Sequence, residues 1–366
     1  MMKELFNFNL LSVPKSIVHN RHYLTAKEGT LGYIGYLGHG NFGDEAMYVA
    51  VQRLFNDINI LPFKFSNKIE LLEKIKSRKI YKAVLLGGGT LINSKGSLSE
   101  LKIAQDRYGL SFVFGAGVKN PDFWDRFAKG ENFLKEWVQL LKKCQFVGVR
   151  GPLSKKILEQ NGFYGAEIIG DSALSLARNN ISSKNKRKKV GVNFGFSGGK
   201  AWGNDNDFLA FMAKFTKVII EKGWEVTFLP VLRDDIPYIE DVARRVGKSE
   251  VKLIYEYMNI ERTLDFLEDC DLFIGEKLHS VILAKCVYTP SIMLEYRPKC
   301  LDFMMSLGLE DFNIRIDVLS IELMLHLIDK LYKNLDLYQQ KIYQKVDYFR
   351  NIQKDKRDKI TDMLLR

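Results

Sequence analysis

Short runs of apolar residues alternate along the chain with longer stretches in which apolar residues recur every three or four positions. The first pattern predicts buried strands and the second predicts amphipathic helices. In the first half we expect strands at 31–36, 60–63, 83–86, 111–114, 146–149 and 167–169, with helices that include 44–55, 122–142 and 152–160. This alternation predicts a parallel sheet whose strands are connected by crossover helices.

The same alternation starts again after a polar segment at 178–189. Strands are expected at 190–194, 225–229, 252–254, 272–274 and 291–294, and the tail has the pattern of one or two long helices. We therefore predict an α/β protein with two Rossmann-like, doubly wound domains that face each other across a cleft, which is a GT-B-like plan. The predicted units are an N-terminal domain over 1–178, a basic linker over 179–189, a C-terminal domain over 190–320, and C-terminal helices over 321–366 that pack across the lobes.

Length and composition agree with this plan. A chain of 366 residues favours two domains, and 46% hydrophobic with 27% charged residues is typical of globular proteins. No apolar run approaches the ~20 residues of a spanning helix, and residues 1–16 lack the pattern of a signal peptide. The four cysteines show no metal-binding spacing, which suits thiols in a reducing compartment. We expect a cytoplasmic protein, with association at the inner face of the membrane as the alternative.

The chain carries a net charge of +11. Such a charge suits nucleic acid, an anionic membrane surface or an anionic substrate. The densest basic run, 184–189, is equally explained as a solvated linker, and a basic tail would suit membrane docking as an alternative to packing across the lobes. Neither an RNA-binding aromatic motif nor a zinc-finger or helix-turn-helix pattern is present, so we expect no nucleic-acid partner.

A glycine-rich loop at 35–45 follows the first strand and leads into a helix. Glycines let the backbone approach a ligand closely, and the helix end supplies N–H donors. The loop is not GxGxxG and has no P-loop lysine, so it indicates neither a dinucleotide nor a nucleoside triphosphate. We expect Asn41, Gly43 and Asp44 to line a ligand site, although Asp44 would also serve simply as a helix cap.

Three further strand ends carry candidate site residues. Gly88, Gly89 and Thr90 follow the third strand, where bare amides and a hydroxyl would face the cleft, or would simply form a tight turn. Arg150 ends another strand, where its planar fork suits a phosphate or a carboxylate. Asp171, with Ser172, follows the last strand of the first half, and we expect it to be a structural acceptor near the cleft.

The segment 273–280 combines an apolar strand with Lys277 and His279 on the first turn of a helix. A helix N-terminus lowers the pKa of a histidine and favours the neutral imidazole, which suits a base. Lys299 follows the next strand, so both lysines are expected at one edge of the sheet. The alternative is that His279 is a buried core residue. Trp202, in a glycine-rich stretch, is a candidate for stacking on a sugar or for packing within its loop.

Taken together, these segments resemble the polysaccharide pyruvyltransferase family. The matched segments occur in the family's order, at 35–45, 87–89, 150–154, 170–174, 277–279 and 296–299. The resemblance implies transfer of the pyruvate unit of phosphoenolpyruvate onto two hydroxyls of a sugar, with release of phosphate and formation of a cyclic ketal. It implies no cofactor and no metal. The implied acceptor is a sugar of a capsule, exopolysaccharide or cell-wall precursor, either lipid-linked or an oligosaccharide.

The resemblance also implies roles for particular residues. It places the acceptor on the N-terminal domain and the donor on the C-terminal domain. For catalysis we expect His279 to carry out the proton transfers, Arg150 with the lysines to stabilise the leaving phosphate, and Asp44 to orient the sugar hydroxyls. The resemblance implies that Arg150, Lys277 and His279 hold the donor, with Lys299 as a further cation, and we expect Ser280 beside them. The residues that we expect to bind the acceptor or to line the loops are Asn41, Gly43, Asp44, Gly88, Gly89, Thr90, Asp171 and Ser172. Lys277 stands where the family usually has arginine, and an ammonium cannot form a bidentate fork.

Two other functions compete with this one. A glycosyltransferase that uses a nucleotide sugar is suggested by Glu268 and Glu276, which have the spacing of some retaining enzymes. These residues flank a predicted strand, so their carboxylates should lie ~20 Å apart, too far for one nucleotide. A non-catalytic carbohydrate-binding scaffold is the second competitor, and it would need no cationic cluster at the cleft.

Overall fold

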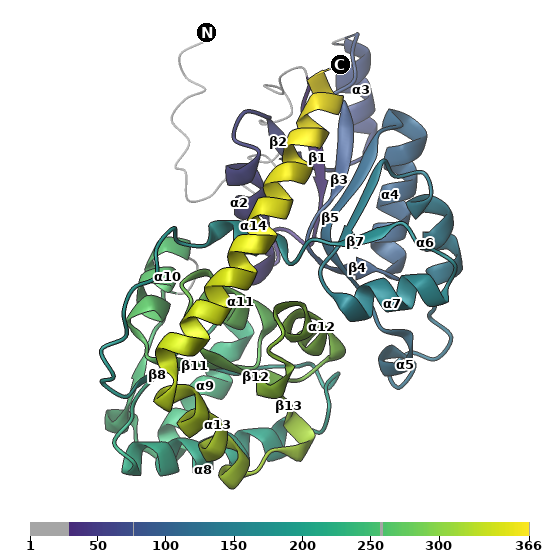
Figure 1. Ribbon diagram of the computed structural model, residues 1–366. Helices are drawn as coiled ribbons and strands as arrows, with labels where there is room; N and C mark the ends of the chain where they lie inside the picture. The colour runs from purple at the N-terminus through teal and green to yellow at the C-terminus, as the bar shows by residue number, and fades with distance from the viewer. Residues whose placement is uncertain (1–28, 76, 257–258, 366) are drawn as a thin grey trace, which may run out of the picture.

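The chain folds into two lobes, each built on a parallel sheet (Figure 1). The computed structural model describes residues 29–75, 77–256 and 259–365, so the N-terminal segment considered above for a signal peptide lies outside the described residues. The predicted α/β architecture of two Rossmann-like, GT-B-like halves is confirmed. The first sheet ends at Ile168 and the second begins at Lys189, and the domain boundaries drawn between them stay predictions.

The first lobe has the strand order β2-β1-β3-β5-β6-β7, with β4 paired to β5. Its strands are β1 (Leu31–Ile34), β2 (Ile60–Pro62), β3 (Ala83–Leu86), β4 (Gly89–Ile92), β5 (Ser111–Val118), β6 (Phe146–Val149) and β7 (Ala166–Ile168). Its helices are α2 (Phe42–Leu54), α3 (Asn67–Ile75), α4 (Lys95–Tyr108), α5 (Pro121–Trp124), α6 (Leu134–Leu141), α7 (Pro152–Gln160) and the 3-10 turn η1 (Ser172–Leu176).

The second lobe has the order β10-β9-β8-β11-β12-β13. Its strands are β8 (Lys189–Asn193), β9 (Glu225–Phe228), β10 (Val251–Leu253), β11 (Leu272–Gly275), β12 (Ser291–Glu295) and β13 (Asn313–Arg315). Its helices are α8 (Asp205–Glu221), α9 (Ile236–Val246), α10 (Ile260–Asp269), α11 (Leu278–Cys286) and α12 (Pro298–Leu307), with 3-10 turns η2 (Arg233–Asp235), η3 (Lys248–Glu250), η4 (Glu310–Phe312) and η5 (Ile316–Val318). The tail forms α13 (Ile321–Lys333) and α14 (Leu335–Leu365).

Each sheet reverses its strand order at one point, and these points define where a ligand is expected. The reversal falls between β1 and β3 in the first sheet and between β8 and β11 in the second. At such a point the loops leave the two neighbouring strands in opposite directions and open a crevice at the carboxyl ends. The loops that follow these four strands are therefore the first places to look for a site.

The structure differs from the prediction in the helix expected at 122–142 and in two strands that were not predicted, β4 and β13. The single helix expected at 122–142 is wrong, because the chain forms α5 and α6 with a turn between them. Gly130 has a φ of 76°, a left-handed conformation that a helix interior does not accept. Strand β4 was not predicted, because its glycine start resembles a loop. It pairs with the outer half of β5 beyond a register shift near Gly115, whose φ is 76°.

Helix α14 crosses both lobes (Figure 1). Its first half places Tyr338, Ile342 and Val346 in the core of the second lobe, and its last turns place Ile360 and Leu364 in a core cluster of the first lobe. Between them, the buried Gln353 donates two hydrogen bonds of 2.9 Å, to the carbonyls of Ile169 and Asp171. The helix therefore fixes the two lobes to each other and holds the segment that leads into Asp171.

We expect Gln353→Leu to lower the free energy of unfolding by about 1–3 kcal/mol, because two buried carbonyls lose their donor. Urea unfolding followed by circular dichroism measures this change. Gln344→Leu, at an exposed position of the same helix, is the matched control and should change stability by less than about 0.5 kcal/mol. Equal stability of the two variants would show that Gln353 does not carry the contact between α14 and the first lobe.

Candidate functional site

Arg150 is buried between the lobes with part of its hydrogen-bonding capacity unused. It follows β6, and only 1% of its surface is exposed. Nη2 donates to Thr90 Oγ1 at 3.2 Å, whereas Nη1 lies 3.6 Å from Asp171 Oδ2 and Nε lies 3.7 Å from Asp302 Oδ2. Nε and Nη1 have no hydrogen-bond acceptor among the described residues. Buried polar groups normally have hydrogen-bond partners, so these two nitrogens have donor capacity that the described residues do not use.

The segment after Arg150 joins the lobes. Ser154 donates from its amide and from its hydroxyl to the two carboxylate oxygens of Asp302 in α12, at 3.0 and 2.6 Å. A Cβ on Gly151 would lie 2.2 Å from the Asp302 carbonyl, so only glycine permits this approach. The structure therefore explains the Arg-Gly-x-x-Ser pattern. Arg150, Gly151 and Ser154 all lie close to Asp302 of the opposite lobe.

His279 lies on the first turn of α11 and faces the first lobe. Its Nε2 is 3.3 Å from Met47 Sδ and 3.9 Å from Asp171 Oδ2. A Cβ on Gly43 would lie 2.0 Å from His279 Nδ1, so this glycine makes room for the ring. Burial, reinforced by the charges of Lys299 and Arg150, lowers the pKa of His279 well below its usual value. The imidazole is therefore neutral at pH 7 and suits a proton acceptor.

Asp44 and Lys299 lie on opposite sides of the same cleft and influence each other's charge. Burial raises the pKa of Asp44 toward neutrality, while Lys299 and Arg150 act against this shift and Asp171 adds to it. Burial, followed by the charge of Arg297, lowers the pKa of Lys299, and Asp44 opposes that change. Asp171 is fully buried, and burial raises its pKa as well. The site thus combines the Asp44 carboxyl group, whose raised pKa favours the protonated form, with the neutral imidazole of His279.

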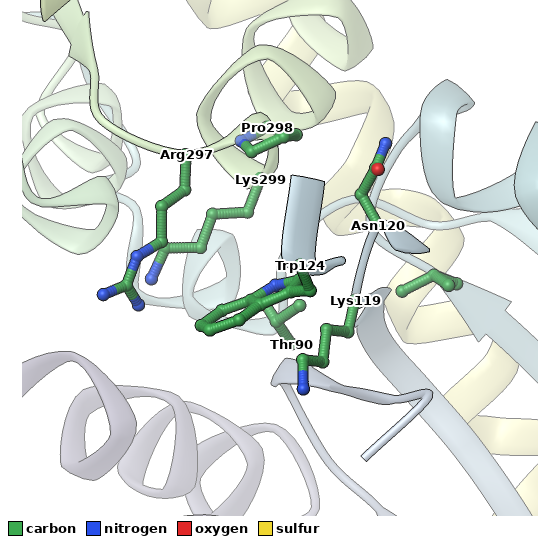
Figure 2. A pocket seen from close by; sticks show the side chains of 8 residues that line it. Thr90, Lys119, Asn120, Trp124, Arg297, Pro298 and Lys299 are labelled. Carbon is green, nitrogen blue, oxygen red and sulfur yellow. The ribbon is translucent and has the colours of Figure 1, made fainter. Parts of the chain in front are cut away.

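A cavity of about 150 Å³ opens between the lobes beside these residues (Figure 2). Its walls are Thr90, Val118, Lys119, Asn120 and Trp124 from the first lobe and Arg297, Pro298 and Lys299 from the second. Sites for drug-sized ligands measure roughly 300–1,000 Å³, so this cavity suits a smaller molecule. Three cations and no carboxylate line it, which favours an anion.

Arg150, Asp44 and His279 do not line the cavity, but each is connected to a residue that does. Arg150 is connected through its hydrogen bond to Thr90, and the charge of Lys299 acts on both Asp44 and His279. The nitrogens of Arg150 that lack acceptors, Nε and Nη1, are themselves buried and do not line the cavity.

Lys277 is directed into its own lobe. Its Nζ donates to the Phe196 carbonyl at 2.9 Å and to Glu276 Oε1 at 3.0 Å, and it lies 3.9 Å from Asp235. Lys277 does not line the cavity, and no ion pair or hydrogen bond joins it to Arg150 or His279 within the part of the chain that the structure describes. Lys277 and Lys299 contact the same aromatic ring, that of Tyr296. The ring centre lies 4.9 Å from Lys277 Nζ and 5.0 Å from Lys299 Nζ.

The remaining predicted residues have local roles close to the cluster. Asn41 caps α2 by accepting from the Gly43 amide, and the Ser280 hydroxyl donates to the Lys277 carbonyl at 2.6 Å. A Cβ on Gly88 would meet Met47 Sδ and Ser172 Oγ, and one on Gly89 would lie 3.6 Å from Asp44 Oδ1. The structure therefore brings Gly43, Asp44, Gly88, Gly89, Thr90, Arg150, Asp171, Ser172, His279 and Lys299 together, and it holds the side chains of Asn41, Lys277 and Ser280 in backbone or intra-lobe contacts.

Of the eight residues that line the cavity, the sequence predicted Thr90 and Lys299 as site residues and missed the other six. Three of those six are Arg297, Trp124 and Lys119, and the Trp124 ring contacts the other two. The centre of the Trp124 ring lies 4.5 Å from Lys119 Nζ and 5.2 Å from the Arg297 guanidinium carbon. Arg297 donates to the carbonyls of Ser197 and Lys200, so no carboxylate neutralises it in these contacts. Lys119 follows β5 and Arg297 follows β12. A basic residue at the carboxyl end of a strand is the sequence pattern that would have predicted both residues as part of the site.

A model of the family described as polysaccharide pyruvyl transferase matches residues 41–298. That span is more than half of the chain, and the protein belongs to this family. The resemblance noted in the sequence is thereby confirmed. No curated protein is significantly similar to this one in sequence.

Solved structures show a similar fold at low sequence identity. A putative UDP-N-acetylglucosamine 2-epimerase from Listeria monocytogenes is 12% identical with a TM-score of 0.56, over 89% of this chain and 94% of that one. Phytolacca americana UGT2, solved with UDP-2-fluoro-glucose and pterostilbene, is 9% identical with a TM-score of 0.54, over 92% and 100%. The UDP-GlcNAc 2-epimerase of Methanocaldococcus jannaschii is 12% identical with a TM-score of 0.52, over 82% and 92%. These similarities establish the GT-B-like fold alone.

We expect Gly43→Ala to lower the free energy of unfolding by about 1–3 kcal/mol, because the new methyl group overlaps the His279 ring. Gly96→Ala is the matched control, since Gly96 is also the second residue of a helix and a Cβ there meets nothing within 4 Å. The control should be neutral or slightly stabilising. Urea unfolding of the two variants and the wild type gives the comparison, and equal stabilities would contradict the contact between Gly43 and His279.

Proposed function

We propose that this protein transfers the pyruvate unit of phosphoenolpyruvate to a sugar of a cell-surface polysaccharide or its precursor, forming a cyclic ketal and releasing phosphate. The observation that supports this most is the cavity between the lobes, which is lined by Lys119, Arg297 and Lys299 and by no carboxylate. Phosphoenolpyruvate carries a phosphate and a carboxylate on three carbons, and a small cationic cavity suits such an anion.

The buried Arg150 supplies the second part of the donor site. Its Nε and Nη1 groups lack acceptors, and a carboxylate or phosphate oxygen would satisfy them. Lys299 faces the same region, and an anion there would raise its lowered pKa and restore its charge. In this proposal Arg150 and Lys299 hold the donor, Arg297 stabilises the departing phosphate, and Lys277 shapes the second lobe through Glu276.

The reaction balances with two proton transfers. The methylene carbon of phosphoenolpyruvate accepts one proton and becomes a methyl group, which leaves an electron-poor carbon next to the carboxylate. One sugar hydroxyl attacks that carbon, and the second hydroxyl attacks as the carbon–oxygen bond to phosphate breaks. The two hydroxyls release two protons, of which one balances the methyl group and the other leaves on phosphate. The site therefore needs one acid, one base and cations at the leaving group.

The electrostatics of the site suggest how these roles are divided. Two titratable groups whose environments move their pKa values in opposite directions are natural partners in acid–base catalysis. The pKa of Asp44 is raised, so its carboxyl group holds a proton more readily than usual, and the pKa of His279 is lowered, so its imidazole is free to accept one. We assign the donation of the proton to Asp44 and the deprotonation of a sugar hydroxyl to His279.

The alternative function is that of a glycosyltransferase that uses a nucleotide sugar, as the similarly folded UGT2 structure contains one. In the second sheet the crevice between β8 and β11 is occupied by Glu276 and Asp235, both buried and both bound to the chain's own groups. These two groups bind Lys277, the cation at this position, so it is not available to a diphosphate. Glu268 and Glu276 lie at opposite ends of β11, so the pair does not form one nucleotide site. Both features favour the pyruvyl donor.

The direct test incubates the purified protein with phosphoenolpyruvate and a panel of bacterial surface glycans. We expect release of inorganic phosphate that depends on the glycan, together with a pyruvate ketal on the glycan detected by mass spectrometry. Transfer from a UDP-sugar in place of phosphoenolpyruvate would support the alternative and contradict the proposal.

In that assay we expect His279→Gln to lower kcat/KM for phosphoenolpyruvate by about 10²- to 10⁴-fold, the usual contribution of a general base. His326→Gln is the matched control, because His326 is exposed on α13, and it should retain full activity. Asp44→Asn, which cannot donate the same proton, should lose activity to a similar extent. Wild-type turnover by His279→Gln would remove this residue from the reaction.

The pH dependence of kcat/KM follows from the directions of the pKa shifts. Because Asp44 must be protonated and Lys299 must be charged, activity should fall as pH rises through the neutral range. Because the pKa of His279 lies well below 6.5, its protonation should cause no loss of activity near pH 6.5. A profile that instead rises between pH 6 and 8 would contradict this assignment.

A further inference from the structure

Trp202 was predicted from the sequence either to stack on a sugar or to pack within its loop. In the structure its ring contacts other side chains of the protein. The Arg315 and Arg126 guanidinium carbons lie 3.9 and 4.8 Å from the centre of its ring, and its Nε1 donates to Glu295 Oε1. A ring held in this way packs within the protein and offers little open face. Aromatic faces that remain open must be sought at other strand ends.

The loop that follows β1 carries a stacked and exposed aromatic pair. The rings of Tyr36 and His39 lie 4.0 Å apart at an angle of 15°, and 54% of Tyr36 is exposed. His39 is exposed as well. Stacking covers one face of Tyr36, so the exposed surface includes the other. The same loop ends at Asn41, the N-cap of α2, and Asp44 of the cluster lies on the first turn of that helix.

A second stacked pair comes from the opposite lobe. Phe196 follows β8 and is 41% exposed, and its ring lies 5.6 Å from that of Tyr238 on α9, at an angle of 24°. The Phe196 carbonyl accepts from Lys277, and the Phe196 amide donates to Asp235. These hydrogen bonds fix the backbone of Phe196 at the carboxyl end of the second sheet.

The segments that carry the two pairs are connected through one contact between the lobes. Asn41 forms an antiparallel bridge with Leu232, and the Phe42 amide donates to the Val231 carbonyl at 3.1 Å. His39 lies two residues before this bridge. On the other side, Asp235 binds the amides of Leu232 and Phe196. The backbone contacts at Asn41 and Asp235 therefore connect the loop of the Tyr36–His39 pair with the segment that carries Phe196.

We propose that the Tyr36–His39 pair and the Phe196–Tyr238 pair form the subsite that binds the acceptor glycan. This inference rests on the proposed function and assigns the carbohydrate platform that the function requires. The C–H face of a pyranose ring is apolar and packs on an open aromatic face, while its hydroxyls stay in contact with water or polar groups. Rings already fixed by stacking lose little conformational freedom on binding, which favours affinity.

The experiment measures sugar binding without requiring turnover. Saturation-transfer NMR is recorded with lactose, cellobiose and N,N′-diacetylchitobiose, in the presence and absence of phosphoenolpyruvate. We expect transfer to at least one disaccharide in the wild type, and an increase in its Kd of about tenfold in Tyr36→Ala and in Phe196→Ala. Tyr36→Phe keeps the ring and should bind as the wild type does.

Tyr164→Ala provides the matched control. Tyr164 is 78% exposed and lies between α7 and β7, at the amino end of a strand and hence at the opposite edge of the first sheet. This variant should bind sugar normally. Unchanged affinity in Tyr36→Ala and Phe196→Ala, or no transfer to any disaccharide in the wild type, overturns the inference. Stronger transfer to uridine than to the sugars overturns it as well, because the platform would then serve a nucleobase.

Failure of the inference is distinguishable from failure of the proposed function. If the aromatic variants bind sugar normally while phosphoenolpyruvate still releases phosphate in the presence of glycan, only the platform is wrong. If the variants lose sugar binding but no phosphate is released from phosphoenolpyruvate under any condition, the platform binds carbohydrate and the donor assignment is wrong.

Discussion

The arrangement of the site depends on one buried cation, Arg150, whose hydrogen bonds are incomplete. Burying a guanidinium is costly unless its N–H groups find acceptors, and here two of them do not. The protein keeps this group in place with charges at 3.6 and 3.7 Å, on Asp171 and Asp302, which balance it without saturating it. An anion that enters the cleft would complete the hydrogen bonding. In the proposed function, these unused N–H groups are what binds the donor.

Other parts of the fold keep this cation in position. Asp302 belongs to the second lobe and is bound by Ser154 of the first, and Gln353 of α14 holds the backbone beside Asp171. Apolar residues of α2 belong to the core of the second lobe, so the junction is closed by packing as well as by polar contacts. Enzymes gain from such preorganisation, because groups that are fixed before the reaction need no reorganisation during it.

The sequence predicted most of the fold because local patterns decide it. Helix α7 has the predicted limits, since Pro152 starts it and glycine follows it. Strand β4 and the break between α5 and α6 escaped prediction because they depend on the partner strand β5 and on a left-handed glycine. In the site, strand ends predicted Arg150 and His279 near one another, and both side chains lie within 4 Å of Asp171 Oδ2. The direction of Lys277 was not predictable, since a long side chain follows whichever acceptors the folded lobe offers, here Glu276 and the Phe196 carbonyl.

A crystal structure of the protein with phosphoenolpyruvate would test the central claim most directly. The account predicts the anion between the lobes, with its oxygens about 3 Å from Nε or Nη1 of Arg150 and from Lys299 Nζ, and with Arg297 at its outer end. An anion bound elsewhere, with Arg150 still lacking acceptors, would contradict the account.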